Sequence, residues 1–247
     1  MLKRLLKSHP ALWRTARRLR QELAGSVERE MALLPHLVPA DRIAVDVGGN
    51  TGAYCERLVR LARSVVVLEA NPELAEHLHW MFEGKVRVVQ AAASDAPGEL
   101  ILRMPEDPAF GGLATVSLEN PLVGGKSVRV PACSLDSLGL ESVGFIKIDV
   151  EGHEVAVLEG ARNLLATQRP NLLLEAEERH KVGAVTQVRA ILEPLGYAGF
   201  MLRGGVLTSI RTFDPAVHQS MAGTSAGALD SGRVPSGYIN NFVFLPQ

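Results

Sequence analysis

The sequence predicts an α/β fold in which a mostly parallel β-sheet carries helices on both faces. From residue 43 to residue 195, short apolar segments alternate with segments of helical periodicity, as in chains that wind around a parallel sheet. The first apolar segment ends in a glycine-rich turn that opens a helix. With 247 residues and 47% hydrophobic residues, the chain suits one such domain with a modest extension.

Seven strands are expected, and their carboxyl ends indicate where a ligand would bind. The predicted strands cover residues 43–47, 65–69, 86–90, 144–149, 171–175, 197–202 and 238–245. The predicted helices cover residues 53–62, 72–82, 153–167 and 183–195. Ligands of open parallel sheets bind outside the carboxyl ends of the strands, where the strand order reverses. Chemistry is therefore expected at the last residue of each strand.

The first 40 residues read as a basic helical extension before the main domain, residues 41–247. The first twenty residues hold seven basic side chains and no acid. One interpretation is an amphipathic helix that contacts an anionic membrane or a partner, and the other is a helical cap with a solvated basic face. The whole chain has a net charge of −1, which predicts no nucleic-acid partner.

Two stretches interrupt the α/β alternation. Residues 98–132 read as a β insertion around a Gly- and Pro-rich centre, and residues 211–237 read as a mobile loop. The two cysteines, Cys55 and Cys133, form no disulfide framework, which suits a reducing compartment. No apolar run is long enough to span a bilayer and no secretory signal is visible, so a cytoplasmic location is expected.

The glycine turn narrows the class of ligand. It reads I-A-V-D-V-G-G-N-T-G from Ile43, with Asp46 two residues before the first glycine, Gly48. Asn50 and Gly52 break the Gly-x-Gly-x-x-Gly spacing of dinucleotide sites, and no Gly-Lys-Ser/Thr of a P-loop follows. An acid here would repel a phosphate but suits a cationic ligand such as S-adenosylmethionine (SAM), which carries an ammonium and a sulfonium.

The second and third strands each lead to an acid. Glu69 closes the second strand and could accept hydrogen bonds from a ribose diol, or it could stabilise the start of the helix that follows Asn71. Asp95 follows the third strand and could accept from an adenine amino group. Alternatively, it serves the turn S-D-A-P-G.

The fourth and fifth strands carry the candidate catalytic residues. Lys147 and Asp149 lie on one face of the fourth strand, as a structural ion pair or as part of the site. His153 is the candidate base, because imidazole titrates near neutral pH, and Asp149 and Glu175 would orient it or the substrate. A divalent metal bound by Asp149, His153, Glu175 and His180 is possible, although no tight ligand spacing supports it, so no metal ligand is assigned. Residues 177–179 read as a solvated helix start.

Several motifs together resemble the FkbM family of SAM-dependent methyltransferases. They are V-D-V-G-G-N-T-G, L-E-A-N-P, A-A-x-S-D-x-x-G and F-I-K-I-D-V-E-G-H-E-V-x-V-L-x-G-A. The resemblance implies a seven-stranded class I (Rossmann-like) methyltransferase fold over residues 41–247. It also implies cofactor roles for Asp46, Gly48, Asn50, Gly52, Glu69 and Asp95. The resemblance also marks Lys147, Asp149, Glu151, Gly152, His153 and Glu175 as matching motif positions, and their catalytic roles are assigned from chemistry.

The expected function is SAM-dependent O-methylation of a sugar, glycan or polyketide-type hydroxyl. An NAD-dependent oxidoreductase or epimerase is the first alternative, and Asn50 in place of a glycine speaks against it. The second alternative is a non-catalytic SAM-binding module. Five ionisable groups between residues 147 and 154 speak against it.

Overall fold

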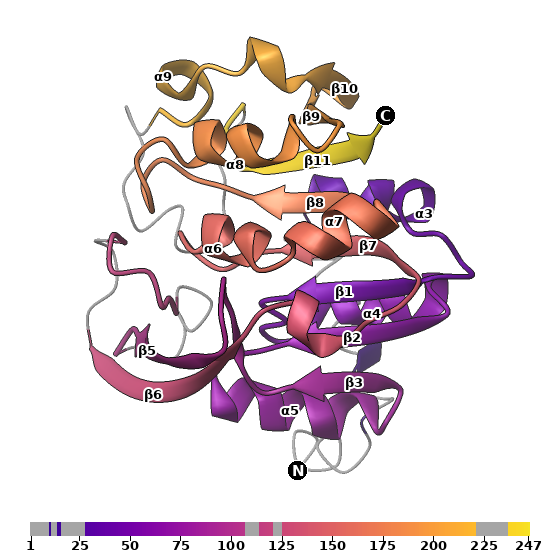
Figure 1. Cartoon of the computed structure of the whole chain (residues 1–247), viewed down its shortest axis with the longest axis vertical. Helices are drawn as coiled ribbons and strands as arrows, with labels where there is room; N and C mark the ends of the chain where they lie inside the picture. Colours follow the sequence, from indigo (N-terminus) through magenta and orange to yellow (C-terminus); the bar gives the residue numbers. More distant parts are fainter. Residues whose placement is uncertain (1–9, 11–13, 16–27, 107–113, 121–124, 221–236) are drawn as a thin grey trace.

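The computed structural model describes residues 10, 14–15, 28–106, 114–120, 125–220 and 237–247 (Figure 1). A large sheet with helices packed on both faces makes up the body of the molecule, and a smaller sheet stands at one side of it. The α/β class predicted from the sequence is confirmed.

The large sheet has eight strands in the order β10-β9-β11-β8-β7-β1-β2-β3. The central strands run parallel, while β11 is antiparallel to β8 and β9, and β10 is antiparallel to β9. All seven predicted strands are present, within one to three residues of the expected bounds. The strands are β1 (Ile43–Val47), β2 (Ser64–Leu68), β3 (Val86–Val89), β7 (Val143–Ile148), β8 (Asn171–Glu175), β9 (Tyr197–Arg203), β10 (Val206–Ser209) and β11 (Asn241–Pro246).

The predicted count of seven strands is wrong, because β10 adds an eighth at the edge of the sheet. Strand β9 ends at Arg203, which pairs with Val206 across a two-residue turn. Gly204 and Gly205 fill that turn with φ of 58° and 83°. Two central residues with positive φ form the hairpin turn whose twist matches that of the flanking strands.

Strand side chains alternate between two hydrophobic clusters, one on each face of the sheet. Val45 and Val47 of β1 pack on the side that carries α6 (Glu154–Glu159), α7 (Arg162–Gln168) and α8 (Ala184–Leu192). Ala44 packs on the other side, with α3 (Leu34–Leu37), α4 (Ala53–Leu61) and α5 (Pro72–Phe82). This two-sided burial explains why the central strands are apolar along their whole length.

The strand order reverses beside β1. The chain runs outward from β1 to β2 and β3, and it then returns to place β7 on the other side of β1. Crevices at such reversals, outside the carboxyl ends of the strands, are where ligands of open α/β sheets bind. The glycine turn after β1 and the polar segment after β7 meet at this point.

The helix predicted over residues 153–167 is two helices, α6 and α7, which meet at Gly160. A Cβ on Gly160 would lie 2.0 Å from the carbonyl oxygen of Ser94, so this position packs against backbone and admits no side chain. The Asp136 carboxylate accepts hydrogen bonds of 3.0 and 2.8 Å from the first free N–H groups of α7, those of Asn163 and Leu164. A cap supplied from elsewhere in the chain therefore starts the second helix.

The predicted β insertion forms the smaller sheet, with strand order β4-β6-β5. Its strands are β4 (Ala92–Ala93), β5 (Gly98–Met104) and β6 (Lys126–Cys133), with η3 (Asp136–Leu138) just after them. In the described part of residues 211–237, η4 (Ile210–Thr212) ends and α9 (Pro215–His218) follows. Mobility of that stretch stays a prediction, because most of it lies outside the described residues.

The N-terminal extension is described only in part. Its end forms η1 (Arg29–Leu33) and α3, which packs against the sheet. The predicted basic helix of the first twenty residues lies outside the described residues, apart from Pro10, Arg14 and Thr15. In the described ranges, no helix is long and apolar enough to cross a membrane.

Candidate functional site

The glycine turn packs directly against the end of β7. Gly48 has a φ of 84°, and a Cβ there would lie 1.9 Å from the carbonyl oxygen of Asp149. A side chain would therefore separate the two strand ends that form the crevice. Gly52, with a φ of 82°, is the N-cap of α4 and packs against Leu78 and Phe82, so its place in the structure is at the helix start.

A pocket opens at this crevice. Five of the ten residues predicted for the site line it: Gly48, Asn50, Glu69, Asp149 and His153. The sequence did not single out the apolar lining, which comes from β1, β2, α5, the segments after β2, β3 and β7, and the insertion: Val47, Leu68, Ala70, Leu74, Ala91, Ala92, Ala93, Leu102, Ala114, Val116 and Val150.

Glu69 directly follows β2, and its carboxylate accepts two backbone hydrogen bonds. One comes from the N–H of Asn50 at 2.7 Å and the other from the N–H of Asn71 at 2.8 Å. Burial raises the pKa of this carboxyl, and the two N–H groups counteract the shift. Each carboxylate oxygen keeps a lone pair for a further donor, which suits a ribose diol.

Asp46 and Lys147 lie behind the pocket, on the face that carries α4. The Lys147 ammonium, 0% exposed, lies 3.4 Å from the Asp149 carboxylate and 5.0 Å from the centre of the Tyr54 ring. Burial opposes this charge, but the surrounding carboxylates, with Asp149 first, outweigh burial and raise the Lys147 pKa. Asp46 accepts a 3.1 Å hydrogen bond from Cys55, and burial raises its pKa to about 7. Neither residue lines the pocket, so both act on it through their neighbours.

His153 faces the pocket from the start of α6, and its Nε2 lies 3.0 Å from the Ser94 hydroxyl. That hydroxyl gives its one hydrogen to Asp95 at 3.0 Å, so it accepts a hydrogen from His153 Nε2. Burial lowers the His153 pKa, and the Asp95 charge opposes the shift. Asp95 itself is exposed and outside the pocket lining.

Two acids stand at the end of β8, the half-buried Glu175 and, two residues later, the buried Glu177. Glu175 accepts a 2.7 Å hydrogen bond from Asn240, and burial together with the nearby Asp149 charge raises its pKa well above the ordinary value. Glu177 is 2% exposed and receives two hydrogen bonds from Arg179, at 2.7 and 3.0 Å. Burial opposes ionisation of Glu177, but Arg179 outweighs it and lowers the pKa to about 2. The prediction that residues 177–179 form a solvated helix start is therefore wrong.

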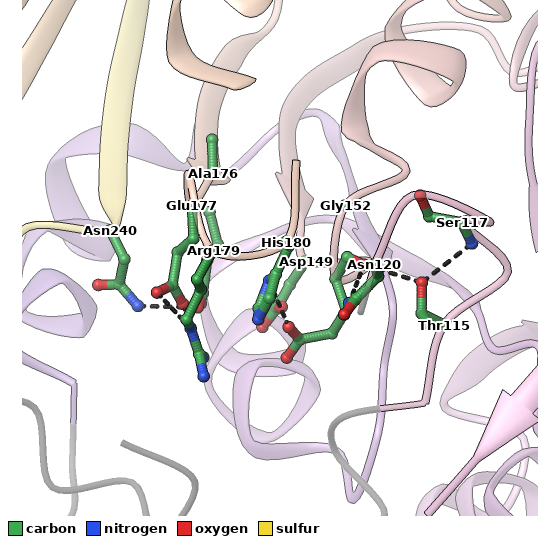
Figure 2. Close-up of polar contacts among 12 residues, drawn as sticks. Thr115, Ser117, Asn120, Asp149, Gly152, Ala176, Glu177, Arg179, His180 and Asn240 are labelled. Carbon is green, nitrogen blue, oxygen red and sulfur yellow. Dashed lines mark hydrogen bonds and ion pairs between the residues drawn. The ribbon is translucent and has the colours of Figure 1, made fainter. Parts of the chain in front are cut away.

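Figure 2 shows a row of polar side chains beyond the ends of β7 and β8 that point toward the same side: Asp149, Glu177, Arg179, His180 and Asn240. Asp149 and Gly152 come from the segment after β7, whereas Glu177, Arg179 and His180 come from the segment after β8. Asn240 precedes β11 and completes the row. The row holds acids, an amide, a guanidinium and an imidazole, which together can bind and deprotonate hydroxyl groups.

The possible metal site is not assembled in the part of the chain that the structure describes. Within it, no group of three or more His, Cys, Asp or Glu side chains is placed to hold a metal ion. His180 instead pairs with Glu151, His153 with Ser94, and Glu175 with Asn240.

Comparison with known families identifies the class of protein. Residues 46–198 match the model of the methyltransferase FkbM domain. This chain therefore belongs to the FkbM family and is a SAM-dependent methyltransferase. The match covers the glycine turn, the strand-end acids Glu69 and Asp149, and the entire segment after β7.

One solved structure agrees at the level of fold. Methyltransferase FkbM from Methylobacillus flagellatus KT superposes with a TM-score of 0.53 at 14% identity. The alignment covers 83% of this chain but only 43% of that one, so this chain spans less than half of its length. A TehB-like SAM-dependent methyltransferase from Corynebacterium glutamicum gives a TM-score of 0.48 at 13% identity, covering 97% and 99% of the two chains. No curated protein sequence matches.

Proposed function

We propose that this chain transfers a methyl group from SAM to a hydroxyl of a sugar, glycan or polyketide-type small molecule. The observation that carries the proposal is the pocket that joins the glycine turn, Glu69 and Asp149 at the strand reversal. It opens beside a row of acids and an amide, which are the groups that bind hydroxyls. The NAD-dependent alternative is set aside, because the chain belongs to a methyltransferase family.

The residues present suit SAM. In the proposed binding mode, Glu69 holds the ribose and the backbone at Gly48 and Asn50 faces the methionine end, with Asp46 and Gly52 shaping the turn. Asp95 as an adenine ligand stays a prediction. When bound, SAM supplies an activated methyl on a cationic sulfur, so the protein has only to position the acceptor and remove its proton.

Asp149 is proposed to contact the acceptor oxygen. It lines the pocket, and Lys147 fixes its carboxylate from behind. Glu175 would contact the acceptor from the neighbouring strand end, while His153 stays a predicted base. Substitution of Asp149 by Asn should lower kcat by about 100-fold or more while leaving the affinity for S-adenosylhomocysteine within about threefold.

The test is transfer of labelled methyl from SAM to a panel of glycosides and phenols, followed by mass spectrometry of the product. Appearance of a methyl ether supports the proposal. Methylation confined to nitrogen, carbon or carboxylate acceptors in the same panel would contradict it. Repeating the assay with EDTA tests whether the reaction needs a metal, because a chelator would abolish a metal-dependent reaction.

The cytoplasmic location and a membrane or partner contact through the basic first twenty residues are proposals that rest on the sequence alone. The same holds for the absence of a nucleic-acid partner. Sedimentation with anionic vesicles, compared between the full chain and a chain that begins at Glu28, tests the contact. Equal sedimentation of both would speak against it.

A further inference from the structure

His180 and Glu151 form a buried pair that the pocket description leaves without a role. The Nδ1 atom of His180 lies 2.8 Å from a carboxylate oxygen of Glu151, and the side chains are 3% and 11% exposed. His180 belongs to the segment after β8, and Glu151 to the segment after β7. The pair thus joins the ends of two neighbouring strands.

The other ring nitrogen of His180, Nε2, is enclosed and has no hydrogen-bond partner among the described residues. Native proteins leave few buried polar atoms in this state, and each one needs an explanation. The facing Glu151 oxygen is close to Nδ1 but lies outside good hydrogen-bond geometry, so its negative charge is what favours the hydrogen on Nδ1 and the lone pair on Nε2 of the neutral ring. The ring is thereby prepared to take a proton at Nε2.

The backbone around Glu151 is held in an uncommon conformation by two other segments of the chain. Glu151 has a φ of 50°, which non-glycine residues rarely adopt. Its carbonyl oxygen accepts hydrogen bonds of 2.8 Å from both Thr115 and Asn120 of the insertion. A Cβ on the next residue, Gly152, would lie 3.3 Å from the Cβ of His180. A conformation fixed from so many sides is typical of functional sites.

The pair lies beside the cofactor pocket. Asp149 and Val150, the two residues before Glu151, both line that pocket. Figure 2 shows His180 and Asp149 pointing toward the same side, beyond the ends of β7 and β8. A hydroxyl bound by Asp149 would therefore lie near the His180–Glu151 pair.

We propose that His180, oriented by Glu151, is the general base of the methyl transfer, an inference that rests on the proposed function. The acceptor O–H gives its proton to Nε2 while the oxygen–methyl bond forms. The methyl–sulfur bond breaks, and its electron pair stays on sulfur. The products are the methyl ether, S-adenosylhomocysteine and an imidazolium, whose charge the Glu151 carboxylate stabilises until solvent removes the proton.

This assignment moves the base from His153, the sequence-based candidate, to His180. The Nε2 atom of His153 is engaged with Ser94, which is next to Asp95 on the side of the small sheet. In that tautomer His153 keeps a lone pair on Nδ1. The two histidines are distinguished by substitution.

Because Nε2 is enclosed, an acceptor reaches it only after a local movement, and the segment 114–120 is in direct contact with Glu151. Ala114 and Val116 of this segment line the pocket, while Glu119 forms an exposed 3.4 Å ion pair with Lys181, next to the base. This ion pair contributes little to stability, so the larger cost of the movement is the opening of the Thr115 and Asn120 hydrogen bonds to the Glu151 carbonyl. A closed segment over the bound acceptor would also exclude water from the reaction.

The first test is nitrogen NMR of the imidazoles with S-adenosylhomocysteine bound, from about pH 6 to about pH 9. The Glu151 contact raises the His180 pKa against the effect of burial. The charged groups around the pair are Asp149, Glu154, Glu177, Arg179, Lys181 and Glu119. The proposal predicts that Nε2 loses its proton as the pH rises and that Nδ1 keeps its own. A neutral ring with the hydrogen on Nε2, or an imidazolium throughout, would overturn it, whether or not an acceptor is known.

The second test compares His180→Gln, Glu151→Gln and His153→Gln in the glycoside and phenol panel. Loss of the base should lower kcat in His180→Gln by about 100-fold or more, with the KM for SAM within about threefold. Glu151→Gln should lower kcat less and shift the pH at which the rate rises. His79→Gln, at an exposed position on α5, is the matched control.

Calorimetry with S-adenosylhomocysteine separates the possible failures. Each variant has to bind this product, which shows that the fold and the cofactor pocket are intact. Normal turnover of His180→Gln together with loss of turnover in His153→Gln would overturn the assignment and leave the proposed function standing. A wild-type protein that binds no S-adenosylhomocysteine would instead overturn the proposed function.

Discussion

At the scale of single residues, Glu69 is the side chain on which cofactor recognition depends. Its carboxylate is fixed by the N–H groups of Asn50 and Asn71 before any ligand arrives. A ribose diol therefore meets an acceptor that is already in place, which keeps the entropic cost of binding low.

Replacement of Glu69 by Gln should weaken binding of S-adenosylhomocysteine by roughly 10- to 100-fold, because hydrogen bonds to a charged group contribute about 1.5–3 kcal/mol. Isothermal titration calorimetry measures the effect. Glu73→Gln, at an exposed position in the first turn of α5, is the control and should bind as the wild type does. Equal affinities for the Glu69 variant and the control would remove Glu69 from the cofactor site.

The sequence predicted which residues stand at the strand ends better than it predicted which side chains pair with each other. Glu69 and Asp149 line the pocket as expected, because they follow directly from the strand pattern. The pairing of Glu151 with His180 has no local signal, since it arises only when β7 and β8 lie side by side. Burial of Glu177 was missed for the same reason: its partner Tyr238 lies far along the chain.

At the scale of elements, the periodicity of the apolar residues and the positions of the glycine turns predicted most of the fold. Strands β1, β2, β7 and β8 were recognised because both of their faces are buried, which leaves long apolar runs. The break between α6 and α7 was not predicted, because its causes, the backbone of Ser94 and the Asp136 cap, are distant in sequence. Strand β10 was missed although Gly204-Gly205 is a hairpin signal, since the strand is short and largely exposed.

Gly160 offers a direct test of the α6–α7 junction. Substitution by Ala should lower the free energy of unfolding by about 1–3 kcal/mol, because the new methyl group would overlap the Ser94 carbonyl. Urea denaturation followed by circular dichroism measures it. Gly98→Ala is the matched control, since nothing lies within 4 Å of the methyl group it would add. A Gly160 variant as stable as the control would show that the junction tolerates a side chain.

At the scale of the whole molecule, buried acids make stability depend on pH. The Asp46 pKa rises from 3.8 to about 7 on folding, chiefly because the carboxyl is buried. Between these values the folded chain holds a proton that the unfolded chain releases. The stabilisation is complete below the unfolded pKa and is lost as the pH rises through the folded one.

Replacement of Asp46 by Asn removes this dependence. Relative to the wild type, the variant should gain roughly 2 kcal/mol of unfolding free energy between about pH 5 and about pH 8. Urea denaturation at the two pH values gives the difference. Asp41→Asn, at an exposed position, serves as the control. A wild type and an Asp46 variant whose stabilities change in parallel would contradict the burial argument.

The proposed function depends on a SAM site at the point where the strand order of the sheet reverses. Titration of the folded chain with S-adenosylhomocysteine in a calorimeter, with NAD as the comparison ligand, tests this claim most directly. We expect saturable binding of one S-adenosylhomocysteine per chain, an increase in Tm that grows with its concentration, and no heat from NAD. A properly folded chain that releases no heat with S-adenosylhomocysteine and shows no change in Tm would contradict the account.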